Sequence, residues 1–244
     1  MDLRSVKCVL LVVLNFVGVL HAQQILNVKY QTKYFDDTFP SELKYKVDTK
    51  KSLFINYTKE IDPKTAKISE KNQIGGVFTD YKEEFVKDFN ENVVYSNSNI
   101  SYVKKTVVKE NLEFDWKIDY TVFKTILNYK CYMAKTFFKG RDYTVYFTTE
   151  INIPDGPRKF ANLPGLILEV SEDSGILKII AKDLQYIDDQ PYFNLDIKNA
   201  ISWNDAIIKA KVIFNESRNE IENKYNSRVK TDFSNHLEKF DLNN

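Results

Sequence analysis

Alternating apolar and polar residues predict β-strands along most of this chain. In the first stretch, Leu26, Val28, Tyr30, Thr32 and Tyr34 occupy every second position, which is the spacing of a strand with one buried face. The same alternation recurs at 43–47, 54–57, 93–95, 102–108 and 112–118. Residues 58–92 are charged and follow no clear period, so we expect an irregular connection there, with a short helical piece around 81–89.

The stretch 128–182 combines aromatic-rich strand patterns with clear turn signals. Residues 129–138 and 143–147 predict two strands joined by the turn Lys139-Gly140-Arg141-Asp142, because glycine readily adopts the positive φ that hairpin turns need. Leu163-Pro164-Gly165-Leu166 fits a type II turn, with proline second and glycine third. Two further strands are expected at 166–170 and 176–182.

The period changes near the C-terminus. Ser202 can cap a helix, with Asp205 three residues later in the capping-box position. Ala206, Ala210 and Ile213 then recur at helical spacing, which predicts an amphipathic helix over about 202–223. Together the patterns predict a mainly β (α+β) fold: a curved antiparallel sheet or half-open barrel with a C-terminal amphipathic helix.

The first 22 residues are typical of a secretory signal. Arg4 and Lys7 precede an apolar run that ends near Ala22, and this run is shorter than the ~20 residues that a spanning helix needs. We therefore expect a signal peptide cleaved near Ala22 and an exported protein that is periplasmic or associated with the outer membrane. Residues 23–244 are expected to form one β-rich domain without a transmembrane segment.

Composition excludes several classes of function. The formal net charge is only +1, so nothing favours nucleic acid as a partner. After removal of the signal peptide, one cysteine and one histidine (His236) remain, too few for the usual structural zinc site. The sequence contains no nucleophile elbow and no glycine-rich phosphate loop. No catalytic constellation is recognisable, which favours a role other than catalysis, and no cofactor is expected.

Cys131 and Met133 allow two interpretations. Because they lie two apart on a predicted strand, their side chains share a face, and a thiolate–thioether pair suits Cu(I). Free cysteine and methionine are also common core residues, and this interpretation is favoured. A reactive, exposed Cys131 is a third possibility, since an odd cysteine in an exported chain can form intermolecular disulfides.

Several blocks of residues resemble a known family. The chain is similar to the GLPGLI family of exported bacterial proteins of the Bacteroidetes type, and the similarity is clearest over 112–182. The blocks that carry it are Asp115-Trp116-Lys117-Ile118, Tyr129-Lys130-Cys131, Gly140-Arg141-Asp142-Tyr143, Asp155-Gly156-Pro157 and Asn162-Leu163-Pro164-Gly165-Leu166-Ile167. Asn162 and Asn128 stand where the family has glycine, and asparagine is the residue that best replaces glycine at positive φ. The resemblance implies an exported protein but no particular activity.

The residues favour a binding site made of aromatic rings and cations. Strands rich in Tyr and Phe can line a concave sheet face, and Arg141 and Arg158 flank the Pro/Gly-rich loop, where they meet either an anion or the carboxylates of the turn. The candidate binding residues are Trp116, Tyr129, Cys131, Arg141, Tyr143, Arg158, Phe160 and Pro164. We expect a non-catalytic binding or chaperone-like module for an unknown envelope ligand or protein. The alternatives are a thiol-dependent enzyme or metal/redox factor centred on Cys131, and an envelope assembly scaffold.

Overall fold

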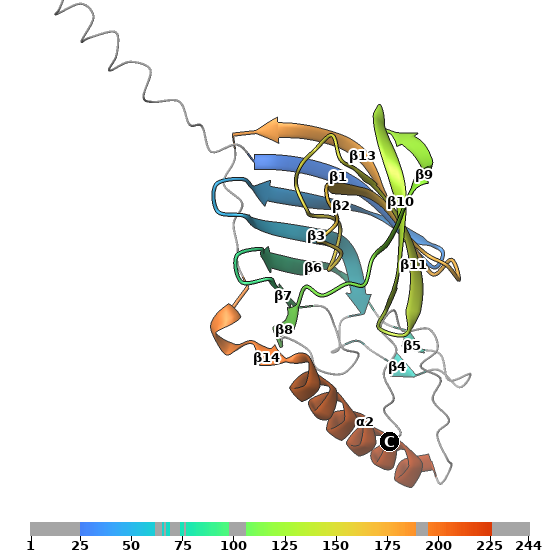
Figure 1. Ribbon diagram of the computed structural model, residues 1–244. Coiled ribbons are helices and arrows are strands. Elements are labelled where there is room, and N and C mark those ends of the chain that lie inside the picture. The colour runs from blue at the N-terminus through green and yellow to red at the C-terminus, as the bar shows by residue number, and fades with distance from the viewer. Residues whose placement is uncertain are drawn as a thin grey trace, which may run out of the picture.

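The protein forms one open, curved sheet of 12 strands followed by a C-terminal helix (Figure 1). This computed structural model describes residues 25–61, 65, 67–68, 74–75, 77–97, 106–188 and 195–225. The strand order is β14-β8-β7-β6-β3-β2-β1-β13-β12-β11-β10-β9. The predicted fold class is confirmed. The expected signal peptide and His236 lie outside the described residues.

The strands of the large sheet are β1 Ile25–Tyr34, β2 Asp37–Lys46, β3 Lys51–Ile61, β6 Phe78–Asp88, β7 Val93–Ser96, β8 Val108–Asn111, β9 Lys117–Ile126, β10 Tyr129–Phe138, β11 Arg141–Thr148, β12 Leu166–Glu172, β13 Leu177–Ile187 and β14 Ile201–Ser202. A two-stranded sheet pairs β4 (Lys67–Ile68) with β5 (Ile74–Gly75). The helices are the 3-10 turn η1 (Ile197–Asn199) and the α-helix α2 (Trp203–Tyr225). Neighbouring strands are antiparallel except for β14 and β8, which run parallel.

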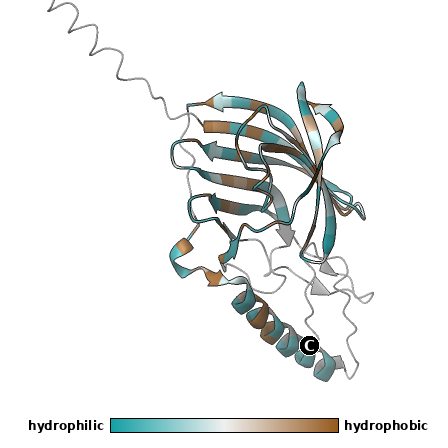
Figure 2. Ribbon diagram, in the orientation of Figure 1, coloured by the Kyte–Doolittle hydropathy of each residue, from teal (hydrophilic) through white to brown (hydrophobic). Residues whose placement is uncertain are grey.

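Every second residue of each strand points into the concave face of the sheet, and most of these residues are apolar. Val28 on β1 faces Leu43 on β2, Leu43 faces Phe54 on β3, and Phe54 faces Phe85 on β6. Leu43, Phe54 and Phe85 are fully buried, so this row crosses the middle of the core. Figure 2 shows the resulting alternation of apolar and polar residues along these strands.

The segment 149–165, between β11 and β12, fills the concave side. Ile151, Ile153, Phe160 and Leu163 are buried in the same core cluster as the inward residues of the sheet. In Figure 1 the segment crosses in front of the strands. The sequence predicted an aromatic concave face as a binding site, but the loop packs its own apolar side chains against that face.

A buried ion pair fastens this loop to the sheet. The Lys87 ammonium on β6 pairs with the Asp155 carboxylate, and both side chains are inaccessible to solvent. Lys87 also donates to the carbonyl oxygen of Gly156 at 2.5 Å. Burial lowers the pKa of Lys87, and the adjacent Asp155 charge opposes that shift. The loop is thus held by charge-assisted hydrogen bonds as well as by apolar packing.

The expectation for residues 58–92 is wrong in its main point. Strand β3 continues to Ile61, and the expected helical piece belongs to β6. These two strands pair over their full lengths, from Lys51 opposite Asp88 to Ile61 opposite Phe78. Pairing with a neighbouring strand overrides local composition here, which is why the charged sequence gave no sign of it.

Two other local predictions also differ from the structure. Residues 112–116 alternate like a strand but form an extended segment that precedes β9. The predicted type II turn does not form. The Leu166 N–H, which would close that turn on the Leu163 carbonyl oxygen, donates to the Ile151 carbonyl oxygen, and the Gly165 N–H donates to the Leu163 carbonyl oxygen. In contrast, Asn128 and Asn162 have φ values of +68° and +65°, so asparagine does keep the positive φ predicted for it.

The helix α2 begins as predicted. Ser202 caps it, since the Asp205 N–H donates to the Ser202 hydroxyl at 3.1 Å and that hydroxyl donates back to the Asp205 carboxylate at 2.7 Å. Ala206 and Ala210 are buried, and the main strand contacts of the helix are with β8 and β14. Within the described residues, no helix is both long enough and apolar enough to span a membrane.

Candidate functional site

The eight candidate residues from the sequence do not form one open site. Trp116, Tyr143 and Phe160 do come together, with the Phe160 ring 4.8 Å from Tyr143 and 6.3 Å from Trp116. This cluster is part of the core: Tyr143 and Phe160 are buried, and the Trp116 indole N–H donates to the Ala161 carbonyl oxygen at 2.9 Å. Half-buried Tyr129 packs against the core, and Pro164 is exposed.

The two candidate arginines meet carboxylates of the protein itself. Arg141 lies 3.1 Å from Glu172 in a buried ion pair. Arg158 lies 2.5 Å from Glu83, and its guanidinium stands over the Phe85 ring. Burial tends to raise the pKa of Glu172, but hydrogen bonds from Ser174, Ile176 and Arg141 lower it below its usual value. Arg158 therefore ties the loop 149–165 to β6, whereas Arg141 ties the start of β11 to the end of β12. The printed partners are Glu83 and Glu172 rather than the expected Asp142 and Asp155.

Cys131 is a core residue. Its side chain is inaccessible to solvent, and burial raises the pKa of the thiol to about 11. Met133 is partly buried. No group of three or more His, Cys, Asp or Glu side chains that could hold a metal ion occurs in the described part of the chain.

We predict that the Cys131 thiol reacts slowly with a water-soluble disulfide reagent at pH 8. The rise of its pKa from 9.0 to about 11 lowers the thiolate fraction roughly a hundredfold, before any hindrance from burial. The absorbance of the released thiol measures the rate, and the same protein in urea serves as the fast-reacting control. Equal rates in the folded and unfolded protein would contradict the buried environment.

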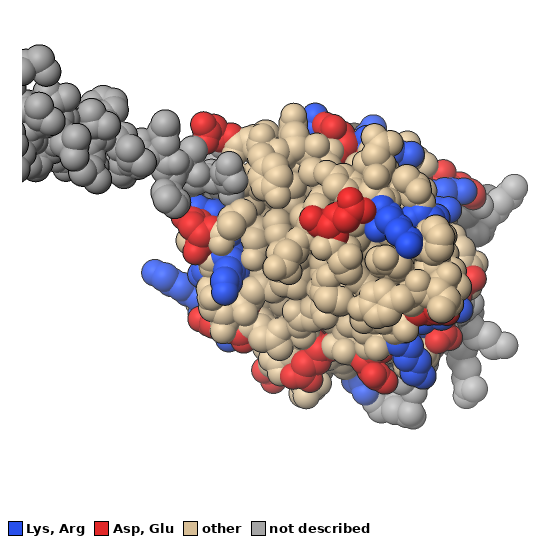
Figure 3. Space-filling model, turned by 45° about the horizontal axis from the view of Figure 1, so that its top comes forward, with Lys and Arg blue, Asp and Glu red and all other residues tan. Residues whose placement is uncertain are grey.

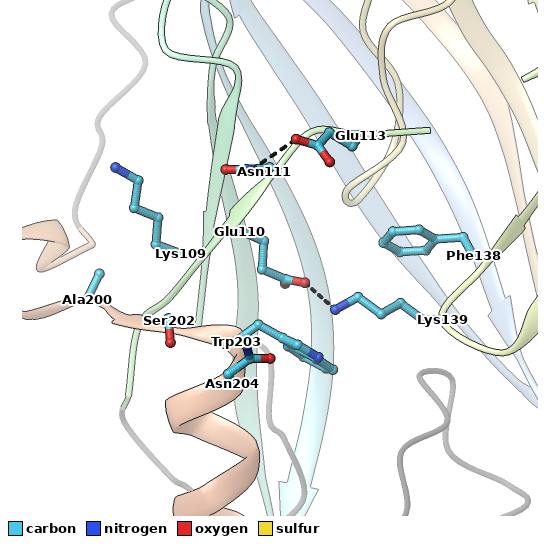
Figure 4. A pocket seen from close by; sticks show the side chains of 10 residues that line it. All are labelled: Lys109, Glu110, Asn111, Glu113, Phe138, Lys139, Ala200, Ser202, Trp203 and Asn204. Atoms are coloured by element: carbon cyan, nitrogen blue, oxygen red, sulfur yellow. Dashed lines mark hydrogen bonds and ion pairs between the residues drawn. The ribbon is translucent and has the colours of Figure 1, made fainter. Parts of the chain in front are cut away.

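The described part of the chain contains a recess that the sequence patterns did not indicate. Its volume is about 660 Å³, within the range of small-ligand clefts. Figure 4 shows the side chains that surround it. They are Lys109, Glu110, Asn111, Glu113, Phe138, Lys139, Ala200, Ser202, Trp203 and Asn204. We call this cavity the Trp203 recess.

Three separate parts of the chain build the Trp203 recess. Strand β8 and the residues after it contribute one wall, and the β10–β11 hairpin contributes Phe138 and Lys139. The third part is the start of α2, where Trp203 follows the capping residue Ser202. Positive φ at Lys139 and Gly140 makes the hairpin turn tight, so the strand ends at the recess.

Charges at the bottom of the recess are paired with each other. Glu110 forms ion pairs with Lys139, at 2.7 Å, and with Lys159. Burial alone would raise the pKa of Glu110, but the two ammonium groups lower it below its usual value. The ammonium groups of Lys139 and Lys159 also lie 3.3 and 4.8 Å from the centre of the half-buried Trp203 ring. The indole is therefore fixed in position by cation–π contacts.

The recess combines aromatic rings with uncharged and charged hydrogen-bonding groups. Trp203 and Phe138 offer apolar surface, while Asn111, Asn204 and the carboxylate of Glu113 offer donors and acceptors. Glu113 accepts a hydrogen bond from the Asn111 amide at 3.0 Å. Such a site suits a ligand that has apolar ring faces and many hydroxyl or amide groups.

The face shown in Figure 3 carries no large patch of one charge sign. On the face shown in Figure 3, acidic and basic side chains of both signs stand mainly around the rim, and the middle is largely uncharged. This distribution agrees with the formal net charge of +1.

Similarity to solved structures is distant. Two crystal forms of PNGF-II have TM-scores of 0.46 and are 18% identical in sequence, covering 77% of this chain and 33% or 34% of theirs. An uncharacterised conserved protein from Thermus thermophilus has a TM-score of 0.39 and 6% identity, covering 74% of this chain and 91% of that protein. The chain thus spans about a third of the length of PNGF-II. No protein of curated function matches the sequence.

The sequence match to a protein family corrects two expectations. The family described as "N-glycanase peptide, N-terminal domain", of the PNGase F-II type, matches residues 28–210. Assignment to the GLPGLI family is therefore wrong. The expected non-catalytic binding or chaperone-like module, with its thiol, metal and scaffold alternatives, is overturned by the same finding. With 28–210 matched out of 244 residues, the chain belongs to the PNGase F-II N-terminal domain family.

Proposed function

We propose that this chain takes part in the processing of N-linked glycans, as an N-glycanase does, and that the Trp203 recess contacts the glycan. Membership of the PNGase F-II N-terminal domain family supports the first half of the proposal. The observation that carries the second half is the composition of the recess, in which Trp203 and Phe138 lie beside Asn111, Glu113 and Asn204.

The apolar and polar groups of the recess suit the two kinds of surface that a sugar presents. The C–H face of a pyranose is apolar and can pack on an aromatic ring, while its hydroxyl groups need both donors and acceptors at their edges. Asparagine amides supply both, and the exposed Glu113 carboxylate supplies acceptors. Glu110 is paired with two lysines, so its part is to hold Lys139 and the indole in place.

We also propose an arrangement of the chain that fits this role. Residues 1–22 would direct export to the periplasm or the outer membrane, and residues 23–244 would form one domain. Export of this kind would bring the recess to glycoproteins outside the cytoplasm. N-terminal sequencing of the exported protein should then read from Gln23.

Isothermal titration with a matched pair of peptides tests the proposed function. One peptide carries an N-linked glycan on its asparagine, and the other has the same sequence without the sugar. We expect saturable heat from the glycopeptide and none from the bare peptide. Equal binding of the two peptides, or binding of neither, would exclude the glycan as the ligand.

We predict that Trp203→Ala weakens glycopeptide binding about thirtyfold, because a central aromatic contact typically contributes about 2 kcal/mol or more. Trp203→Phe should retain part of the affinity, since a ring remains. Tyr186→Ala is the matched control: this tyrosine is 55% exposed on β13 and does not line the recess. If Trp203→Ala and Tyr186→Ala bind equally well, the recess is not the contact.

A further inference from the structure

A second group of exposed aromatic rings lies on strands β9 and β10. Tyr120 is 54% exposed, Phe123 is 56% exposed, and Tyr132 is partly buried. The Tyr120 ring meets the Tyr132 ring edge-to-face at 5.2 Å, and both lie within 6.4 Å of the buried Phe147 ring. We call Tyr120, Phe123 and Tyr132 the β9 platform. It is supported by the core and open to solvent.

An irregularity in β9 creates this platform. Asp119 faces Met133 and Phe123 faces Tyr132, so residues 120–122 have no partner on β10. The Asp119 carboxylate accepts hydrogen bonds from the Thr121 N–H at 2.8 Å and the Thr121 hydroxyl at 2.6 Å, which hold the bulge in shape. A bulge redirects side chains and interrupts the ladder that an added peptide strand would need. The exposed rings are therefore better suited to a ligand than to strand pairing.

Polar groups surround the rings of the platform. The Lys130 ammonium lies 4.1 Å from the centre of Phe123 and 5.1 Å from that of Tyr132. The Lys130 N–H donates to the exposed Glu150 carboxylate at 2.9 Å. The Trp203 recess likewise combines aromatic faces with an ammonium and a carboxylate. Polar groups of both kinds beside the rings favour a carbohydrate ligand over an apolar protein surface.

The β9 platform and the Trp203 recess lie along one strand. Tyr132 and Phe138 are six residues apart on β10 and share a face, a separation of roughly 20 Å at strand spacing. Between the two sites, Lys117 on β9 stands opposite Lys135 on β10 in the strand register. The preceding residue, Trp116, therefore lies next to this part of β10. Phe114 stacks on Trp116 at 5.2 Å and lies 4.9 Å from Phe138. Partly buried aromatic rings thus connect the two sites.

We infer that the β9 platform is a second carbohydrate-contacting site, so that the chain takes an extended oligosaccharide that reaches from the Trp203 recess along β10. This inference rests on the proposed function, because it assigns the recess to a glycan. The inference specifies the ligand as a branched or linear glycan of several sugars, and not only the sugars nearest the peptide.

Titrations with a short and a long glycan test this inference. The short ligand is the N-acetylglucosamine disaccharide from the base of an N-linked glycan, and the long ligand is a complete high-mannose glycan. We expect the long glycan to bind at least about tenfold more tightly. The double variant Tyr120→Ala/Phe123→Ala should lose that gain and bind the disaccharide as the wild type does.

A control variant and the pattern of binding separate the possible outcomes. Phe137 is 68% exposed on the opposite face of β10, so Phe137→Ala should leave both affinities unchanged. Equal affinity for the two glycans would overturn the second site. So would a double variant that still binds the long glycan as tightly as the wild type does. In both cases glycan binding at the Trp203 recess would remain supported. Binding of neither glycan would overturn the proposed function and this inference with it.

Discussion

Replacing Asp155 with alanine should lower the free energy of unfolding by about 3–5 kcal/mol, the range for a broken buried ion pair. The reason is that Lys87 would lose its counter-charge in a site without solvent access, with only the Gly156 and Phe160 carbonyl oxygens left to bind its side chain. Urea unfolding followed by circular dichroism measures the change. Loss of this pair would also remove one of the contacts that hold the segment 149–165 on the concave face.

Two further variants separate the ion pair from general damage to the core. The double variant Lys87→Met/Asp155→Leu removes both charges and should be more stable than Asp155→Ala, because no unpaired charge remains. Asp183→Ala breaks an exposed pair with Lys29 and should cost less than about 1 kcal/mol. A similar loss for Asp155→Ala and Asp183→Ala would refute the importance assigned to the buried pair.

Gly165→Ala should be destabilising by roughly 2–6 kcal/mol, the sum of an overpacking cost and a backbone-strain cost. Gly165 has φ of +149°, and an added Cβ would stand 2.0 Å from the Thr148 carbonyl oxygen. Because that oxygen belongs to the backbone at the end of β11, it cannot move without disturbing the sheet. The urea midpoint of the variant measures the loss.

Gly175→Ala is the matched control for this position. Gly175 also has a positive φ, +87°, but nothing lies within 4 Å of the Cβ that alanine would add. Only the cost of a left-handed alanine remains, about 1–2 kcal/mol. Equal losses in the two variants would show that the close approach of Gly165 to β11 is unimportant.

Alternation was enough to predict the architecture but not the arrangement of its strands. The period-two pattern of β1 and the capping box of Ser202 and Asp205 depend only on neighbours in sequence, and both predictions are confirmed. Strand β6 depends on pairing with β3 over eleven residues, and its charged sequence does not show it. The alternation of 112–116 was misleading because an extended segment packing on a core buries alternate residues just as a strand does.

The candidate site was beyond prediction for a similar reason. Glu110, Lys139 and Trp203 are far apart in sequence and meet only because β8, the β10–β11 hairpin and α2 converge. The aromatic and cationic residues that the sequence did single out serve the fold: Phe160 packs in the core, Arg141 pairs with Glu172, and Arg158 pairs with Glu83. Lys139 lies in the predicted hairpin turn. Its contact with the Trp203 ring on α2 depends on the fold and could not be predicted from the sequence.

The most direct test of the Trp203 recess uses the indole N–H signals of the two tryptophans in a nitrogen-15-labelled protein. Titration with the N-acetylglucosamine disaccharide should shift the Trp203 signal until it saturates. The Trp116 signal should stay in place, because its N–H is bonded to the Ala161 carbonyl oxygen in the core. A stationary Trp203 signal at saturating sugar would contradict the assignment of this recess to a glycan.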